Sequence, residues 1–170
     1  MTIHSEHPFA TPEPERDPVR RFRGRMPAPV TVWTTGRGRD REGWTIASML
    51  LAEGPVAEVA GLLDEDSELA DAVTAGAERL VVNLLGPNQA AVADAFARVA
   101  PAPGGPFTVG DWADTDWGPA LTGAAGWLGV RLTGHADRLG WTMMLRGEVE
   151  HVELSDEPAL GYLRGRYLVP

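Results

Sequence analysis

The chain has 170 residues and a formal net charge of −9, and it contains no cysteine. This length is sufficient for one domain with a buried core. The negative charge argues against nucleic acid or an anionic membrane as a partner, because phosphate-rich surfaces would repel the protein. The lack of cysteine excludes disulfides and thiolate metal sites. Every basic residue is arginine, which excludes Schiff-base chemistry on lysine.

The start of the chain is polar and rich in proline. Residues 1–18 hold few large apolar side chains, so we predict a flexible N-terminal arm ahead of one domain over residues 19–170. Five arginines lie in residues 16–25. They indicate a solvated short helix or arm or, alternatively, a contact to a phosphate or a partner subunit. Because Arg20 and Arg21 precede charged residues and a proline, they do not begin an export signal, and we expect a cytoplasmic protein.

Alternating residues predict the first strands. Apolar and hydroxyl side chains alternate over residues 30–35, which is the period-2 pattern of a strand. A connection rich in Arg and Gly follows over residues 36–43, and residues 44–51 return as a second strand.

The middle of the chain mixes strands and helices. Residues 56–63 are compatible with either a helix or a buried strand. Ser67 is a good N-cap for a helix over residues 68–75, and residues 80–85 predict a buried strand. A further amphipathic helix is expected over residues 89–99, with its apolar face formed by Val92, Phe96 and Val99.

Three further strands are expected over residues 125–133, 141–153 and 165–169. Many strands with two short helices favour a mostly β fold, an antiparallel barrel with peripheral helices. The four histidines are scattered along the chain, so no metal site is predicted.

A glycine followed by small hydroxyl residues stands out in the second strand. Residues 43–48 read Gly-Trp-Thr-Ile-Ala-Ser. A glycine lets the backbone approach a planar ring or a phosphate, and neighbouring hydroxyl and N–H groups can then bond it. The same pattern is common on the solvated face of a strand, so the motif by itself does not decide.

Six motifs nevertheless follow one another in a known order. They are Val-Thr-Val-x-Thr-Thr at 30–35, Gly-x-Thr-x-Ala-Ser at 43–48, Asp66-Ser67, the strand at 80–85, the helix segment at 93–97 and Gly165-Arg166-Tyr167. In this order the chain resembles the flavin reductase-like family from residue 20 to residue 170. The resemblance implies the family's split β-barrel, which binds FMN and usually forms a homodimer.

The resemblance also implies which residues meet the flavin. They are Trp44, Thr45, Ile46, Ala47, Ser48, Asp66, Ser67 and Asn83. Ser67 would bind the FMN phosphate at a helix N-terminus, or would serve only as an N-cap. Asn83 would contact the ligand, or would have a purely structural role in its strand.

Two departures from the family pattern bear on binding and catalysis. Where relatives commonly have a basic residue after the serine, this chain has Glu68 within an acidic run, so an arginine from elsewhere would have to supply the charge. The family's Gly-Asp-His segment corresponds to Gly140-Trp141-Thr142, so the histidine is missing and no catalytic residue is assigned. Trp141 would either pack at the core or rim, or form an aromatic wall against the flavin or nicotinamide.

The function that the resemblance implies is NAD(P)H-dependent reduction of flavin, with FMN or alternatively FAD as the flavin. A homodimer would supply reduced flavin to a partner monooxygenase. Because the cofactors carry the hydride chemistry, the missing histidine does not by itself remove activity. Two alternatives stay open: a non-catalytic FMN-binding protein, and a relative that has lost flavin and serves in protein interaction.

Overall fold

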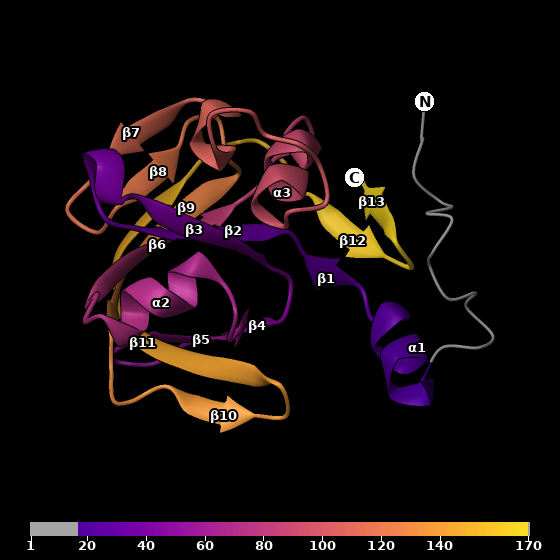
Figure 1. Cartoon of the computed structure of the whole chain (residues 1–170), viewed down its shortest axis with the longest axis horizontal. Coiled ribbons are helices and arrows are strands. Elements are labelled where there is room, and N and C mark those ends of the chain that lie inside the picture. Colours follow the sequence, from indigo (N-terminus) through magenta and orange to yellow (C-terminus); the bar gives the residue numbers. More distant parts are fainter. Residues whose placement is uncertain (1–16, 170) are drawn as a thin grey trace.

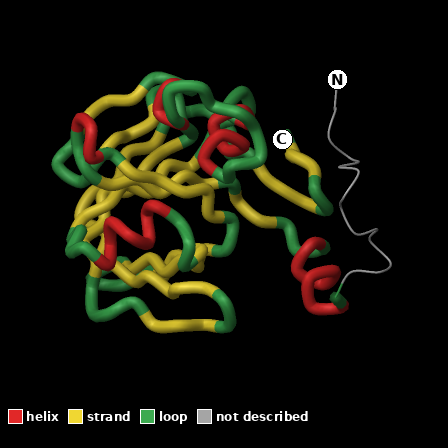
Figure 2. The backbone as a smooth tube through the Cα atoms, in the orientation of Figure 1, coloured by secondary structure: helices red, strands yellow, loops and turns green. Residues whose placement is uncertain are grey.

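The computed structural model describes residues 17–169, and strands dominate it (Figures 1 and 2). The strands are β1 (Ala28–Pro29), β2 (Thr31–Thr35), β3 (Glu42–Ile46), β4 (Met49–Ala52), β5 (Glu58–Asp64), β6 (Arg79–Leu84), β7 (Trp112–Asp114), β8 (Pro119–Leu121), β9 (Gly126–Leu132), β10 (Asp137–Leu139), β11 (Thr142–Leu154), β12 (Gly161–Leu163) and β13 (Arg166–Leu168). The helices are α1 (Pro18–Gly24), α2 (Glu68–Thr74) and α3 (Ala90–Phe96), with short 3-10 helices η2 (Gly38–Asp40) and η3 (Pro106–Thr108). Within residues 17–169, none of these helices has both the length and the hydrophobicity that a membrane crossing needs.

One antiparallel sheet forms the body of the molecule. Its strands follow the order β3-β2-β6-β9-β11-β5-β4, and β10 is added beside β11. The two edge strands β3 and β4 are consecutive in the chain and joined only by Ala47 and Ser48, so the sheet has to curl until its edges approach. The N–H of Leu62 in β5 donates to the carbonyl of Ser48 at 2.9 Å, which extends the β4–β5 pairing by one residue toward β3. The result is the expected mostly β split barrel, with α2 between its β2–β3 and β5–β11 layers (Figure 1).

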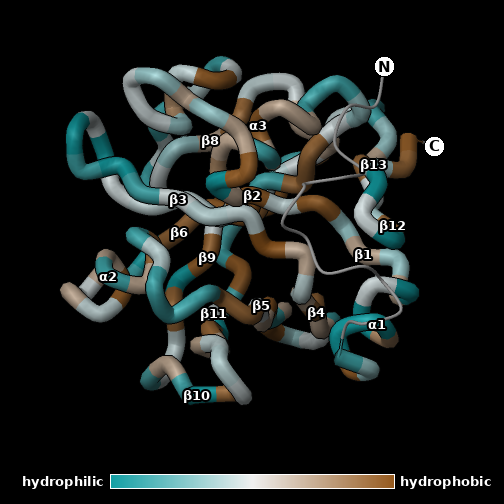
Figure 3. The backbone as a smooth tube through the Cα atoms, turned by 45° about the vertical axis from the view of Figure 1, so that its right-hand side comes forward, coloured by the Kyte–Doolittle hydropathy of each residue, from teal (hydrophilic) through white to brown (hydrophobic). Residues whose placement is uncertain are grey.

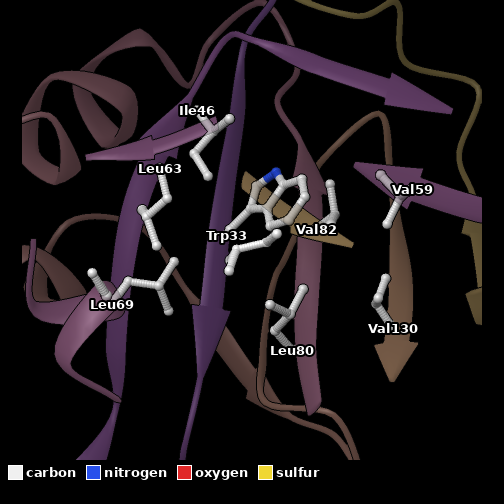
Figure 4. Close-up of a cluster of buried hydrophobic side chains, with 10 residues drawn as sticks. Trp33, Ile46, Val59, Leu63, Leu69, Leu80, Val82 and Val130 are labelled. Carbon is white, nitrogen blue, oxygen red and sulfur yellow. The ribbon is translucent and has the colours of Figure 1, made fainter. Parts of the chain in front are cut away.

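Trp33 fills the interior of this barrel. Its side chain is fully buried, and Figure 4 shows it among aliphatic side chains such as Ile46 and Val82. Trp33 Nε1 donates to Thr31 Oγ1 at 3.1 Å, so the buried indole keeps a hydrogen-bond partner. A Cβ on Gly61 would lie 2.6 Å from the indole ring. Glycine at this position of β5 is therefore what lets the ring reach the opposite wall.

A second core lies on the outer face of the sheet. Val32 of β2 packs there with Val92 and Phe96 of α3. Because the barrel interior covers one face of β2 and α3 with β8 covers the other, all five residues of β2 are buried. The buried Thr34 hydroxyl donates to the carbonyl of Pro119 in β8 at 2.6 Å, so it too has a partner.

Two strand predictions are corrected or resolved by the sheet pairing. The prediction of one strand over residues 44–51 is wrong, because β3 ends at Ile46 and β4 begins at Met49. The break arises where the chain changes partner: β3 pairs with β2, whereas β4 pairs with β5. Residues 56–63, which were compatible with helix or strand, belong largely to β5.

The helices are also adjusted. The helix predicted after the Ser67 N-cap is confirmed as α2, but the one predicted over residues 89–99 is shorter. Arg98 adopts a left-handed backbone with φ of 57°, which ends the helix, and Val99 is 73% exposed instead of facing the core. Residues 1–16 of the predicted arm lie outside the described residues, and Pro18 already begins α1.

Several short strands have no counterpart in the sequence patterns. The strands β1 and β12 join β13 in a three-stranded sheet, and β7 and β8 form a two-stranded ribbon. Strands of two or three residues are too short to show an alternating pattern. They exist because a partner strand is nearby, so only the folded chain defines them.

The Trp33 contact gives a direct test of the fold. We expect Gly61→Ala to lower the free energy of unfolding by about 1–3 kcal/mol, because the added Cβ overpacks the indole. Gly54→Ala is the matched control, since the nearest atom to its Cβ would be 3.4 Å away. Urea unfolding measures both variants, and equal stabilities would contradict the packing described here.

Candidate functional site

A cleft of about 750 Å³ lies between α1 and the edge of the barrel. Its lining comes from α1, residues 26–29, residues 47–50, residues 60–62 of β5 and four residues from the second half of the chain. Figure 3 shows the hydrophilic α1 beside the more hydrophobic β1 and β4 segments. The cleft thus brings together parts of the chain that are far apart in sequence.

Ala47 and Ser48 line this cleft at the break between β3 and β4. Because they belong to neither strand, their N–H groups are outside the sheet ladder. Within residues 17–169, these two N–H groups have no hydrogen-bond acceptor, and the hydroxyl proton of Ser48 has none either. These groups are only half-buried, so they are donors that a ligand in the cleft can use.

The walls of the cleft are apolar. Met49 and Leu50 stand beside the Ala47–Ser48 break, and Leu139, Met144 and Tyr162 come from later strands. Leu50 is 75% and Leu139 is 52% exposed, so apolar side chains at this edge of the barrel face water. An apolar cleft with a few convergent polar groups is typical of a small-molecule site.

Charge in the cleft has one sign. Among the described residues 17–169, Arg20 and Arg23 of α1 are the only charged residues in its lining, and no Asp or Glu of this range lines it. In a chain with 24 acidic and 15 basic residues, this distribution is the reverse of the average. The cleft therefore suits a ligand that is partly apolar and partly anionic.

The other strand residues predicted to meet the flavin do not line the cleft. Ile46 is buried in the barrel core and Trp44 packs partly against it. Thr45 Oγ1 donates to the carbonyl of Ala93 at 2.7 Å, which joins β3 to α3. Of the predicted residues on this strand, the structure brings only Ala47 and Ser48 to the cleft.

Ser67 lies at the start of α2 with its hydrogen-bonding capacity in use. Its side chain is fully buried. The hydroxyl donates to the carbonyl of Asp64 at 2.7 Å and accepts from the N–H of Ala70 at 3.2 Å, which is N-capping geometry. The neighbouring Asp66 is exposed, and its N–H donates to the carboxylate of Asp64. Neither Ser67 nor Asp66 belongs to the cleft lining.

Asn83 is likewise fully buried and bonded within the protein. Its side-chain N–H₂ donates to the carbonyl of Val32 at 3.0 Å, and its side-chain oxygen accepts from the N–H of Leu121 at 2.7 Å. The amide therefore ties β6 to β2 on one side and to β8 on the other. These bonds supply a structural reason for a polar side chain in a buried strand.

Trp141 and Thr142 lie where the chain turns from β10 into β11. The Trp141 side chain is 87% exposed, so the expectation of core packing is wrong: Gly140, with φ of 63°, turns the chain outward here. Thr142 Oγ1 donates to the carbonyl of Leu139 at 2.7 Å and thereby closes the hairpin. Neither residue lines the cleft, although Leu139 next to them does.

The Gly165-Arg166-Tyr167 motif contributes one residue to the cleft and one hydrogen bond to α3. Gly165 lines the cleft, and the hydroxyl of Tyr167 donates to the Asp94 carboxylate of α3. Burial, together with this bond, raises the pKa of Tyr167 far above its usual range, so it stays a neutral donor. The bond anchors the C-terminal hairpin against the barrel.

Sequence reasoning missed Leu139, Met144 and Tyr162 as parts of the site. Nothing in their local sequence distinguishes them from core residues. Two residues of the arginine-rich segment, Arg20 and Arg23, also line the cleft. Among residues 17–169 no group of three or more His, Cys, Asp or Glu is arranged to hold a metal ion.

A model of the flavin reductase like domain matches residues 23–169. That span is most of the chain, and the fold around the cleft is the barrel expected for such a domain. The chain therefore belongs to the flavin reductase-like family. No curated protein matches the chain.

Solved structures support the same fold. A candidate oxidoreductase of Sinorhizobium meliloti is 26% identical with a TM-score of 0.81, over 91% of this chain and 54% of that one. The NADH:FAD oxidoreductase SgcE6 of Streptomyces globisporus is 23% identical with a TM-score of 0.80, over 94% and 95% of the two chains. A homologue of nitrilotriacetate monooxygenase component B from Mycobacterium thermoresistibile is 24% identical with a TM-score of 0.76, over 88% and 83%.

The hydrogen bonds of Ser67 allow its two interpretations to be separated. We expect Ser67→Ala to lower the free energy of unfolding by about 1 kcal/mol through loss of the N-cap, with ligand affinity unchanged. Ser48→Ala is the control, because its hydroxyl faces the cleft and its loss should change stability by less than about 0.5 kcal/mol. Chemical unfolding measures both. A Ser67→Ala variant of normal stability and weakened flavin binding would make Ser67 a ligand contact instead.

Proposed function

We propose that this chain binds FMN in the cleft and catalyses the reduction of flavin by NAD(P)H. The observation that carries the proposal is the break at Ala47 and Ser48, where N–H donors lie beside an apolar wall. The family to which the chain belongs supports flavin as the ligand. The cleft volume of about 750 Å³ lies in the usual range for a cofactor site. FAD is the alternative flavin, because the similar Streptomyces protein is named an NADH:FAD oxidoreductase and is known in complex with NAD and FAD fragments.

In this proposal NAD(P)H would donate a hydride, the bound flavin would accept it, and the chain would position the two. The N–H groups of Ala47 and Ser48 hold the polar edge of the ring. Met49 and Leu50 cover its apolar surface and exclude water. Within residues 17–169 no Asp, Glu or His lines the cleft, so the polar side chains that a reactant would meet there are those of Arg20, Arg23, Ser48 and Tyr162.

The proposal extends to a homodimer that supplies reduced flavin to a partner monooxygenase. Phe22 at 69%, Leu50 at 75% and Trp141 at 87% exposure place large apolar side chains in water around the cleft, and a second copy would cover them. The similar Mycobacterium protein is named as a component of a monooxygenase system. That name supports a partner of the same kind here.

One observation favours a second candidate, a non-catalytic FMN-binding protein. The family's histidine is replaced by Thr142, and the hydroxyl of Thr142 is already bonded to the Leu139 carbonyl. The third hypothesis, a relative without flavin that serves in protein interaction, requires the cleft to bind no flavin at all. The two experiments below separate these functions.

A larger side chain at Ala47 tests FMN binding. We expect Ala47→Leu to weaken FMN binding by at least about tenfold, because the larger side chain occupies the space beside the free donors. Ala52→Leu at the exposed end of β4 is the matched control and should bind FMN normally. Quenching of flavin fluorescence measures both affinities. If the unmodified protein quenches no flavin, the binding proposal and the reductase proposal both fail.

Turnover is tested by its dependence on pH. Since arginines keep their charge and no carboxylate or histidine of residues 17–169 lines the cleft, we expect kcat for NADH or NADPH oxidation to change by less than about twofold between pH 6 and pH 8. Stopped-flow absorbance at 340 nm follows the reaction. A sigmoidal step near the ordinary pKa of histidine would contradict this expectation and point to His135 or His151. FMN binding with no oxidation above the protein-free rate would leave the non-catalytic binder.

A further inference from the structure

The helix α1 is capped at its start and bonded to the rest of the protein at its end. The Asp17 carboxylate caps the helix by accepting from the N–H groups of Val19 and Arg20 at 2.9 and 3.1 Å. At the other end, the N–H of Arg164 donates to the carbonyl of Gly24 at 2.8 Å. This second bond joins α1 to the turn between β12 and β13. The helix thus presents a defined face to the cleft.

Arg20 and Arg23 lie on that face. They are three residues apart, which puts both side chains on one side of the helix, and both line the cleft. Within residues 17–169 neither guanidinium forms an ion pair with a carboxylate. Six other arginines do form such pairs: Arg37, Arg79, Arg98, Arg131, Arg138 and Arg146. As far as residues 17–169 are concerned, the positive charge of these two arginines is not balanced by a carboxylate.

The surroundings of these two arginines favour an anion. In the described part of the chain, residues 17–169, no Asp or Glu lines the cleft beside the guanidinium groups. A guanidinium offers a planar fork of donors that matches the oxygen atoms of a phosphate. The cleft thus combines two guanidinium groups at α1 with the apolar walls and N–H donors at the β3–β4 break.

The start of α2, the alternative position for the phosphate, is surrounded by negative charge. Asp64, Glu65, Asp66 and Glu68 surround the buried Ser67 there. Glu68 is paired with Arg98, and Glu65 lies 3.6 Å from Arg138, but the remaining carboxylates would repel a phosphate. The basic residue that relatives carry after this serine has no equivalent at the same place.

We propose that Arg20 and Arg23 bind the phosphate of the flavin, so that the cleft selects phosphorylated flavins over riboflavin. This inference rests on the proposed function, because it assigns the charged end of the same cofactor. It moves the phosphate contact from the start of α2 to α1. The substrate class is then a flavin 5′-phosphate, either as FMN or as the flavin end of FAD.

The test compares ligands that differ only in the phosphate. We expect the double variant Arg20→Ala/Arg23→Ala to weaken FMN binding by at least about tenfold and riboflavin binding by less than about twofold, because only FMN offers an anion to the guanidiniums. FAD should behave as FMN does. Arg39→Ala is the control for the loss of one arginine, since Arg39 is exposed and does not line the cleft, and it should bind FMN normally. Fluorescence titration gives the affinities, and circular dichroism with urea unfolding verifies that the variants fold.

Each other outcome has a defined meaning. Equal losses for FMN and riboflavin, or no loss for either, would overturn the phosphate assignment while leaving flavin binding intact. A loss confined to NADH would assign the two arginines to the nicotinamide cofactor and likewise overturn it. If the unmodified protein binds neither FMN nor riboflavin, the proposed function itself fails. An Arg20→Lys/Arg23→Lys variant that regains part of the FMN affinity would support the charge-based contact even if the alanine variant is unstable.

Discussion

The contact between the Trp33 ring and Gly61 sets the dimensions of the molecule. It brings β2 and β5, which lie on opposite walls of the curled sheet, to the distance of one indole. Because β4 pairs with β5 and β3 pairs with β2, the same contact decides how far apart the two edges of the sheet stand. Two residues, Ala47 and Ser48, are then enough to connect them. A wider barrel would need a longer connection, and a narrower one would have no space for the indole.

The site follows from that connection. Where the chain leaves β2 and joins β5, the N–H groups of Ala47 and Ser48 have no partner in the sheet of the described residues. In a barrel core such unpaired N–H groups would be costly, but at the edge of the barrel they face a cleft. The other polar side chains predicted to meet the flavin are bonded inside the protein: Thr45 to α3, Ser67 to its own helix, and Asn83 to β2 and β8. The hydroxyl and amide side chains thus stabilise the walls, and the break supplies the open donors.

Sequence patterns predicted the parts of this architecture that depend on local chemistry. The alternation in β2, the N-cap at Ser67 and the order of the six motifs defined the barrel and its family. The division of the second strand could not be foreseen, because it depends on which strand each half pairs with. The same limit applied to Leu139 and Tyr162, which reach the cleft only through strand pairing. Asn83 shows a related difficulty, since a buried amide has the same sequence signature whether it bonds the protein or a ligand.

Because the cleft is positive and the chain as a whole is negative, the salt concentration affects how an anionic ligand approaches the protein. The chain as a whole repels an approaching anion, but at physiological salt its charges act over only about 8 Å. Beyond that distance the counter-ions hide the excess of carboxylates. An anion arriving at α1 therefore meets two guanidiniums before it experiences the rest of the surface. The long-range and short-range fields of this protein have opposite signs, and the salt of the solution decides which of them an incoming ligand encounters first.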